Sequence, residues 1–367
     1  MEYRDCEEQV KEQIRDFLPE KFSDAAIDVS QVLKDNDRAL HVLTIRTGDV
    51  NISPAIYLDP FFEQAEHGKE MEDILVSIAD AYLEHCVDHG IDVSNITDFE
   101  KIRDRITCRL VNEEANTQFL QDKPHTTVED LAVVYQVILD MTTEGMATIT
   151  ISDSLLERYD VSLEELHELA MRNMDTLQPA RFMGMKEVMT EMFAEEFARE
   201  QGMEIQEARD MAAQMVPDIP VNIYVLTNET KLNGAAVILN DDIRQEIAEK
   251  VGDFYILPSS IHETLIIPKS AELDLKDLEQ MVREVNHTQV RPEERLSDHV
   301  YEYDAKGHEL IRCDRAEERD RQKEGMMSGK MERPSLKDRL AEKKNVVAMP
   351  DVGRQEHAID KKSEVVH

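Results

Sequence analysis

The run DLAVVYQVIL is the feature that most limits how this chain can fold. Its residues Leu131–Leu139 are apolar at nearly every position, so an extended strand here would be apolar on both faces. Such a strand belongs in the middle of a sheet that is covered on both sides. After a Thr-Glu-Gly turn, ATITIS has the alternation of a neighbouring strand. We therefore expect a sheet with a central strand that is buried on both faces.

Helical and extended patterns are mixed along the chain, which predicts an α+β fold. Near the N-terminus, AAIDVSQVL and ALHVLTIR alternate on either side of KDNDR, the pattern of two strands joined by a turn. VSLEELHELAMRN begins a helix with Ser162 and Glu165 at capping-box spacing, where each side chain binds the other's backbone N–H. Strands and capped helices thus follow one another within the first half of the chain.

The order of strand, strand and acidic-capped helix recurs between residues 221 and 252. VNIYVLTN and NGAAVIL have strand-like composition, and NDDIRQEIAEKVG follows as a helix. Asn240 or Asp241 would cap this helix, and Gly252 would end it. The sequence therefore predicts two strand–strand–helix units with flanking helices.

Composition changes along the chain predict four parts. Methionines at helical spacing mark a connector between the two units, and apolar periodicity fades after about residue 315. Residues 321–367 hold eleven Lys/Arg and eight Asp/Glu with few aromatic residues, a composition typical of disorder. The expected parts are an N-terminal α+β domain at 1–175, a Met-rich helical connector at 176–218, a C-terminal α+β domain at 219–313 and a disordered polar tail at 314–367.

Charge and composition narrow the classes of partner. The formal net charge of −36 repels a phosphate backbone and an anionic membrane surface. No apolar run approaches the roughly 20 residues that span a bilayer, and the first residues lack the apolar core of a signal peptide. The four cysteines form no CxxC pair, which is typical of reduced thiols in the cytoplasm. We expect a cytoplasmic protein that binds another protein, and neither nucleic acid nor a membrane.

The stretch LPSSIHETLIIP places His262 next to Glu263 and raises the question of a metalloprotease site. A zinc protease motif needs a second histidine four residues after the first, and Ile266 stands there. Ser260 and Glu263 have the spacing of a capping box. The sequence therefore predicts the start of a helix at Ser260, with His262 neither a zinc ligand nor a base.

No other motif singles out catalytic, cofactor-binding or metal-binding residues, and we expect none. His85 and His89 are four apart on a predicted helix and could present two metal ligands, but no third ligand is near in the sequence. G-x-S-x-G, P-loop and G-x-G-x-x-G motifs are absent. One alternative stays open, a hydrolase or metal-dependent enzyme whose dispersed site includes His262 and Glu263, because dispersed sites leave no spacing signal.

Methionine is concentrated in one segment, with nine of the eighteen methionines between residues 171 and 215. Methionine side chains are flexible and polarizable, so Met-rich grooves adapt to several helical ligands. Packing inside a helical hairpin would explain the same cluster. We expect a protein partner to bind either the C-terminal tail or these helices, at Met183, Met185, Met189 and Met192.

Four segments together resemble a bacterial domain-of-unknown-function family, the one numbered fifty-six eighty-eight: VNISPAIYLDPFFEQ, DLAVVYQVI, VSLEELHELAMRN and NGAAVILNDDIRQEIAEKVGDFYILPSSIHETLIIP. The likeness covers roughly residues 5–312. In the tail, RPSLKDRLAEKK is similar to short tails on proteins carried by conjugative elements. The resemblance implies a cytoplasmic protein of a mobile element and implies no activity. The function that we expect is therefore that of a non-catalytic interaction or accessory protein.

Overall fold

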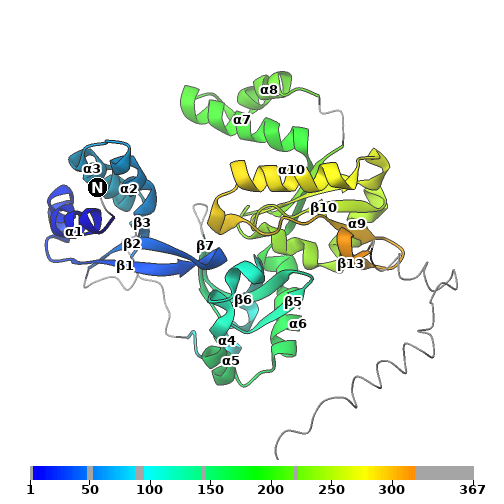
Figure 1. The fold of residues 1–367 in the computed structure, drawn as a ribbon, viewed down its shortest axis with the longest axis horizontal. Helices are drawn as coiled ribbons and strands as arrows, with labels where there is room; N and C mark the ends of the chain where they lie inside the picture. The colour runs from blue at the N-terminus through cyan, green and yellow to red at the C-terminus, as the bar shows by residue number, and fades with distance from the viewer. Residues whose placement is uncertain are drawn as a thin grey trace, which may run out of the picture. The chain divides into compact units, whose positions relative to one another are not determined.

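The computed structural model describes residues 3–47, 53–86, 95–141, 146–218, 222–316 and 318. The chain forms two units, residues 1–313 and residues 314–367. The first unit is an α+β body, as the sequence predicts, in which helices pack against three antiparallel sheets (Figure 1). In the second unit only residues 314–316 and 318 are described, so the tail expected to be disordered lies outside the described residues.

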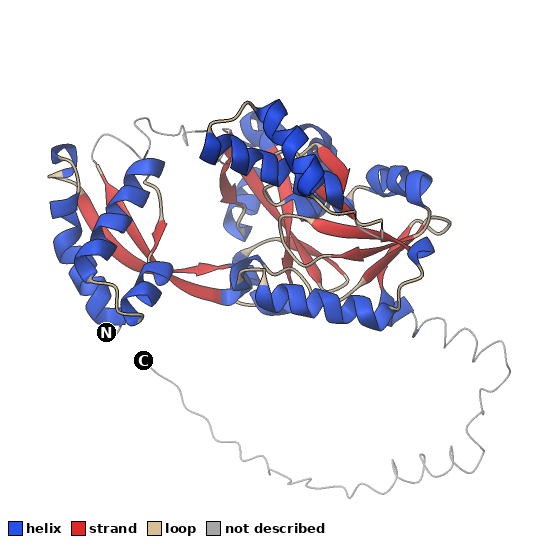
Figure 2. Cartoon of the chain, turned by 90° about the horizontal axis from the view of Figure 1, so that it is seen from above, coloured by secondary structure: helices blue, strands red, loops and turns tan. Residues whose placement is uncertain are grey.

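The N-terminal part of the body has a three-stranded sheet and a core of its own. β1 (Ala26–Lys34) and β2 (Arg38–Arg46) form the predicted hairpin, and β3 (Ile56–Tyr57) pairs with β2. Residues at the open end of this hairpin and on three helices form the core: α1 (Tyr3–Gln13), α2 (Asp59–Glu66) and α3 (Met71–His85). The tip of the hairpin extends beyond that core toward the rest of the body (Figure 2).

The second sheet confirms the predicted central strand. β6 (Leu131–Met141) pairs with β4 (Ile106–Asn112), β5 (His125–Val128) and β7 (Met146–Thr150). One face of β6 packs in the largest core of the body, and the other packs in a small cluster with Leu120. Short helices α4 (Phe99–Ile102) and α5 (Asp153–Tyr159) lie in the same segment, and α6 (Leu163–Leu177) begins with the predicted capping box of Ser162 and Glu165.

The third sheet has six antiparallel strands in the order β13-β12-β10-β11-β9-β8. Two helices cover its two faces, α9 (Asp241–Val251) in the largest core and α10 (Leu275–Thr288) in a separate cluster. As predicted, Asn240 caps α9 and the helix ends before Gly252. The strands are β8 (Ala180–Gly184), β9 (Tyr224–Asn228), β10 (Phe254–Leu257), β11 (Thr264–Pro268), β12 (Tyr301–Asp304) and β13 (Glu309–Arg312).

The second strand–strand–helix unit was a wrong prediction, because Gly234–Leu239 forms a 3-10 helix, η7, in place of a strand. Residues 234–238 are all buried, so the apolar run reflects burial on every side of a compact turn. The chain passes very close to its neighbours here. A Cβ on Gly234 would stand 2.2 Å from the Thr227 hydroxyl oxygen and 2.6 Å from the His262 carbonyl oxygen.

The predicted helix start at Ser260 was also wrong. Residues Thr264–Pro268 form β11, which pairs with β10 and β9 on its two sides. The Ser260 hydroxyl accepts the N–H of His262 at 3.0 Å, so no capping box with Glu263 forms. β-Branched residues at TLIIP suit a central strand, and pairing on both edges outweighs a local capping signal.

The core does not end at residue 175, where the sequence predicts a domain boundary. The largest core combines residues from both expected α+β domains, among them Tyr135 and Phe254. The expected helical connector begins with β8, the edge strand of the third sheet. The separate core is instead the N-terminal one, formed by residues between 6 and 82.

Replacing Gly234 by alanine should destabilise the protein, because the new methyl group has no room beside Thr227 and the His262 carbonyl. We expect a loss of about 1–3 kcal/mol in the free energy of unfolding, as for overpacking of a core. Urea denaturation measures it. Gly184→Ala is the matched control, since nothing lies within 4 Å of a Cβ there. Equal stability of the two variants would contradict the close packing at Gly234.

Candidate functional site

His262 holds a turn of the chain in place. Its Nδ1 accepts the backbone N–H of Asn233 at 3.2 Å, and its carbonyl oxygen accepts the Thr227 hydroxyl at 2.8 Å. With Nδ1 as acceptor, the neutral ring carries its proton on Nε2, which lies 3.7 Å from Glu294 Oε1. Both ring nitrogens therefore face groups that fix the turn beside Gly234.

Glu263, the other residue of the candidate pair, is exposed. Neighbouring protein atoms raise the pKa of its carboxyl group by desolvation. Because the side chain reaches solvent, hydration of the carboxylate offsets much of that effect. The Glu263 side chain is therefore not enclosed in the kind of apolar pocket that strongly raises the pKa of a general acid.

Metal ligands do not converge in the part of the chain that the structure describes. No group of three or more His, Cys, Asp or Glu side chains there is placed to hold a metal ion. The side chain of His85 and the whole of His89 lie outside the described residues, so the expectation that this pair holds no metal ion stays a prediction.

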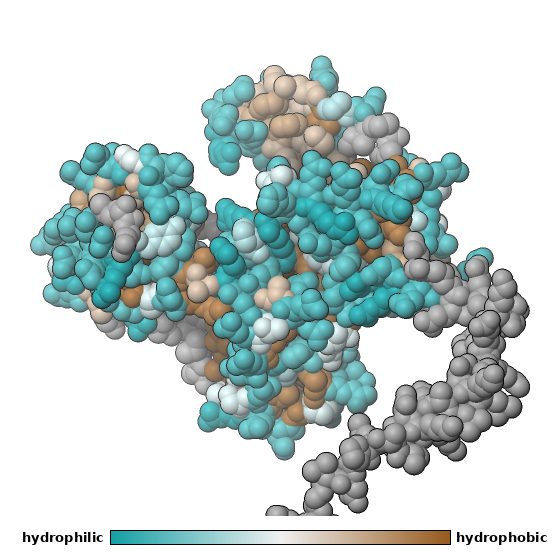
Figure 3. All heavy atoms as spheres, viewed as in Figure 1, coloured by the Kyte–Doolittle hydropathy of each residue, from teal (hydrophilic) through white to brown (hydrophobic). Residues whose placement is uncertain are grey.

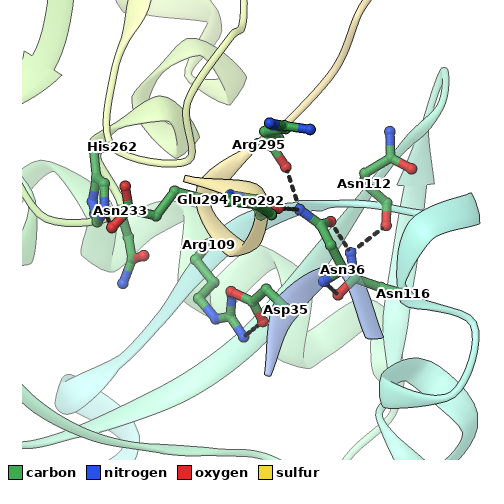
Figure 4. A network of polar contacts seen from close by, with 10 residues as sticks. All are labelled: Asp35, Asn36, Arg109, Asn112, Asn116, Asn233, His262, Pro292, Glu294 and Arg295. Atoms are coloured by element: carbon green, nitrogen blue, oxygen red, sulfur yellow. Dashed lines mark hydrogen bonds and ion pairs between the residues drawn. The ribbon is translucent and has the colours of Figure 1, made fainter. Parts of the chain in front are cut away.

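The tip of the β1–β2 hairpin, η3 (Asp35–Asp37), is the centre of a polar network. The Asn36 N–H donates to Asn116 Oδ1 at 2.7 Å, and Asn116 Nδ2 donates to Asn36 Oδ1 at 2.9 Å. Asn36 Nδ2 donates to the carbonyl oxygens of Pro292 and Arg295 at 2.7 and 2.8 Å. Figure 4 shows Asn36 reaching both Asn116 and the turn at Pro292–Arg295. One side chain thus joins three segments of the body.

The acidic neighbours of Asn36 add two further contacts. Asp35 receives both terminal nitrogens of Arg109, at 2.5 and 2.9 Å, and Arg109 is nearly buried on β4. Asp37 accepts the N–H groups of Gln118 and Phe119 at 2.8 and 2.9 Å. Arg109 therefore has the partner that a buried charge needs.

The pKa of Asp37 shows the balance of these forces. Desolvation would raise it, but the hydrogen bonds from the backbone of Gln118 and Phe119 and from the Thr117 hydroxyl together lower it. We call Asp35, Asn36 and Asp37, with their partners Arg109 and Asn116, the hairpin-tip junction. It fastens the N-terminal part to the rest of the body and offers no nucleophile or general base with a free reacting atom.

The methionine segment forms a helical hairpin of α7 (Met185–Gln201) and α8 (Ile205–Met215). The four methionines expected to bind a partner do not share one environment. Met183 is in β8 with 9% of its surface exposed, whereas Met192 on α7 is 60% exposed. Met185 and Met189 are half-buried. Of these four, Met192 is the one that presents most of its side chain to solvent.

Other large apolar side chains on the two helices are exposed as well. We call this set the hairpin patch: Met192, Phe193, Ile205, Met211 and Met215. Figure 3 shows tan and brown side chains gathered over α7 and α8, beside teal, hydrophilic ones. Met211 and Met215 are four residues apart, so they lie on one face of α8. Counting methionines identified the segment, but the contributions of Phe193 and Ile205 were missed.

Three alanines explain why the large side chains stay outside. Ala194 of α7 packs with Ala208 and Ala212 of α8 in a small core that these helices do not share with the rest of the body. Small side chains let two helices approach closely, so bulky residues on the same helices are left on the outer faces. The Arg181 guanidinium then ties the hairpin to β8 through two 2.7 Å contacts with Glu191.

A hollow of about 590 Å³ lies where the first turns of α7 meet the last turns of α8. Six of its eight lining residues are polar or charged, with both signs of charge present: Gly184, Lys186, Glu187, Thr190, Glu191, Arg209, Asp210 and Ala213. The hairpin thus has a hollow lined by charged side chains and an exposed apolar patch on the same pair of helices.

Comparison with protein families identifies the one to which most of the chain is similar. The model of DUF5688, a family of unknown function, matches residues 3–305. Neither the curated proteins nor the solved structures contain a match to this chain. Among the described residues, no helix is both long enough and apolar enough to cross a membrane.

Replacing Asn36 by glycine should weaken the hairpin-tip junction. Glycine keeps the left-handed backbone of Asn36, φ 60°, but removes the three side-chain hydrogen bonds. We expect a loss of about 2–4 kcal/mol in the free energy of unfolding, measured by urea denaturation. Asn233→Gly is the matched control for the flexibility of glycine, because Asn233 also has a left-handed backbone, φ 54°, but its side chain makes no capping hydrogen bond. Equal losses in the two variants would refute the role of the amide.

Asp37 should make stability depend on acid pH. Its pKa is lower in the folded protein than in the unfolded chain, so its contribution is complete above the unfolded value of about 4 and is lost as the pH falls through the lowered folded value. Stability curves of wild type and Asp37→Asn should therefore converge as the pH falls below about 4. A constant difference between the two curves across that range would contradict the assignment.

Proposed function

Because this chain belongs to DUF5688, a family that carries no assigned activity, we propose a function from its own structure: it is a non-catalytic accessory protein that binds another protein through α7 and α8. The carrying observation is the hairpin patch. Nine large apolar residues are exposed in the described part of the chain, and five of them lie on these two helices. A gathered apolar surface marks an interaction site more often than scattered exposed residues do.

The packing of the hairpin supports a binding surface with a fixed shape. The alanine core holds α7 against α8, and Glu191 is paired with Arg181 at its base. Arg209 of α8 also approaches Glu191, at 3.6 Å. The two helices are therefore held together before a partner arrives, which lowers the entropy lost on binding.

The setting in the cell is part of the same proposal. All four cysteines are free thiols, and the net charge is −36, which together support a reducing, cytoplasmic location and a protein partner. The likeness of the tail to tails of proteins from conjugative elements supports a role in a bacterial mobile element. The enzyme alternative has less support, since His262 is engaged in holding a turn and Glu263 is exposed.

The test compares partner capture by two variants of the full chain. Met192→Ser combined with Met215→Ser removes the two most exposed methionines of the hairpin patch. Met281→Ser is the matched control, because this methionine of α10 is 38% exposed on another element. Proteins retained from extracts of the native host are identified and quantified by mass spectrometry, and thermal melts check that both variants fold.

A partner retained by wild type should be lost or strongly reduced with the double variant and kept with Met281→Ser. Equal retention by all three proteins would place the binding surface elsewhere and would refute the proposal for α7 and α8.

A further inference from the structure

The hairpin patch lies within a strongly acidic segment. Residues 185–215 contain eight Asp/Glu and three Lys/Arg. Glu191 is engaged by Arg181, and Glu195 lies 3.6 Å from the Lys231 ammonium group of the body. The other six carboxylates are exposed, five on the helices and Glu204 at the N-cap of α8: Glu187, Glu196, Glu200, Glu204, Glu207 and Asp210.

Two of these carboxylates lie on the same helix faces as the exposed methionines. Glu196 follows Met192 by four residues on α7, and Glu207 precedes Met211 by four residues on α8. Side chains four residues apart on a helix are neighbours. Met192 and Met211 therefore each have a negative charge one turn away along their own helix, and Met215 lies one turn beyond Met211 on the same face of α8.

We infer that the hairpin patch binds a basic amphipathic helix of another protein. The inference rests on the proposed function and names the class of its partner. Leucine-like side chains of such a helix would pack on Met192, Met211 and Met215, and its Lys and Arg would lie beside Glu196 and Glu207. Flexible methionines adapt to the apolar face of a helical ligand, and that face supplies anchors at helical spacing.

Charge also distinguishes this ligand from a second copy of the chain. Two copies joined by their hairpin patches would bring two acidic surfaces together, which costs free energy. A basic helix gains from the same charges, both in affinity and in rate of association. Its binding should therefore weaken as salt is added, because salt screens exposed charges.

The absence of tryptophan from the chain gives a clean measurement. A synthetic helical peptide with leucines on one face, lysines on the other and one tryptophan on the apolar face is titrated with the full-length protein. Its tryptophan emission then reports burial without a background from the protein. A second peptide has the same apolar residues and glutamate in place of every lysine.

The lysine peptide should bind with a blue shift of its emission, and the glutamate peptide should not bind. Met192→Ser with Met211→Ser and Met215→Ser should weaken binding by at least about tenfold, since three apolar contacts are lost. Glu196→Gln with Glu207→Gln should weaken it by about threefold or more at low salt. Met281→Ser should bind as wild type does, and thermal melts confirm that each variant is folded.

Four results would overturn the inference. They are no binding of the lysine peptide, equal binding of both peptides, binding that the triple methionine variant leaves unchanged, and a dimer in sedimentation experiments that the triple variant abolishes. If host-partner capture depends on Met192 and Met215 while the lysine peptide fails to bind, the proposed function stands and the partner is of another class. If capture is unaffected, the proposed function itself fails.

Discussion

The pair of side-chain amides at Asn36 and Asn116 is the interaction on which the arrangement of the body depends. Asn116 Nδ2 donates to the side-chain oxygen of Asn36, and Asn116 Oδ1 accepts the backbone N–H of Asn36, so one residue satisfies both ends of the Asn116 amide. Asn116 is fully buried and also donates to the Asn112 carbonyl oxygen at 2.7 Å. Without the Asn36 side chain, the buried amide of Asn116 would keep its bond to Asn112 and lose the one to Asn36, and losing a hydrogen bond to a buried group costs more than a surface hydrogen bond contributes.

The same contact fastens the N-terminal part to the rest of the body, with which it shares no apolar core. Its core is built from helices and the open end of the hairpin, and the largest core of the body contains none of its residues. Apolar packing therefore does little to fasten the two together, and directional polar contacts at Asp35, Asn36 and Asp37 do so instead. Hydrogen bonds of this kind set orientation more strictly than apolar burial does.

The sequence correctly predicted turns and helix caps, because these depend on residues close together in the chain. The turn at KDNDR, the capping box of Ser162 and Glu165 and the cap of α9 at Asn240 all depend on residues a few positions apart. The partners of Asn36 are 80 and 256 residues away in the chain, so no spacing could reveal the junction. Long-range pairing also explains the failure at Ser260, where β9 and β10 draw Thr264–Pro268 into a strand. For the candidate surface, the density of methionines indicated the right segment. The sequence does not show which of these methionines a neighbouring element covers, as it does Met183, and which stay exposed, as Met215 does.

In the α7–α8 hairpin, the residues that hold the helices together are different from the residues that are exposed for binding. Ala194, Ala208 and Ala212 decide whether the helices stay together, while Met192 and Met215 point away from that seam. Mutations at the outer positions can therefore change ligand preference without loosening the helix pair, whereas enlarging one alanine would push the helices apart. Descendants of such a protein can diversify in what they recognise while inheriting an unchanged scaffold.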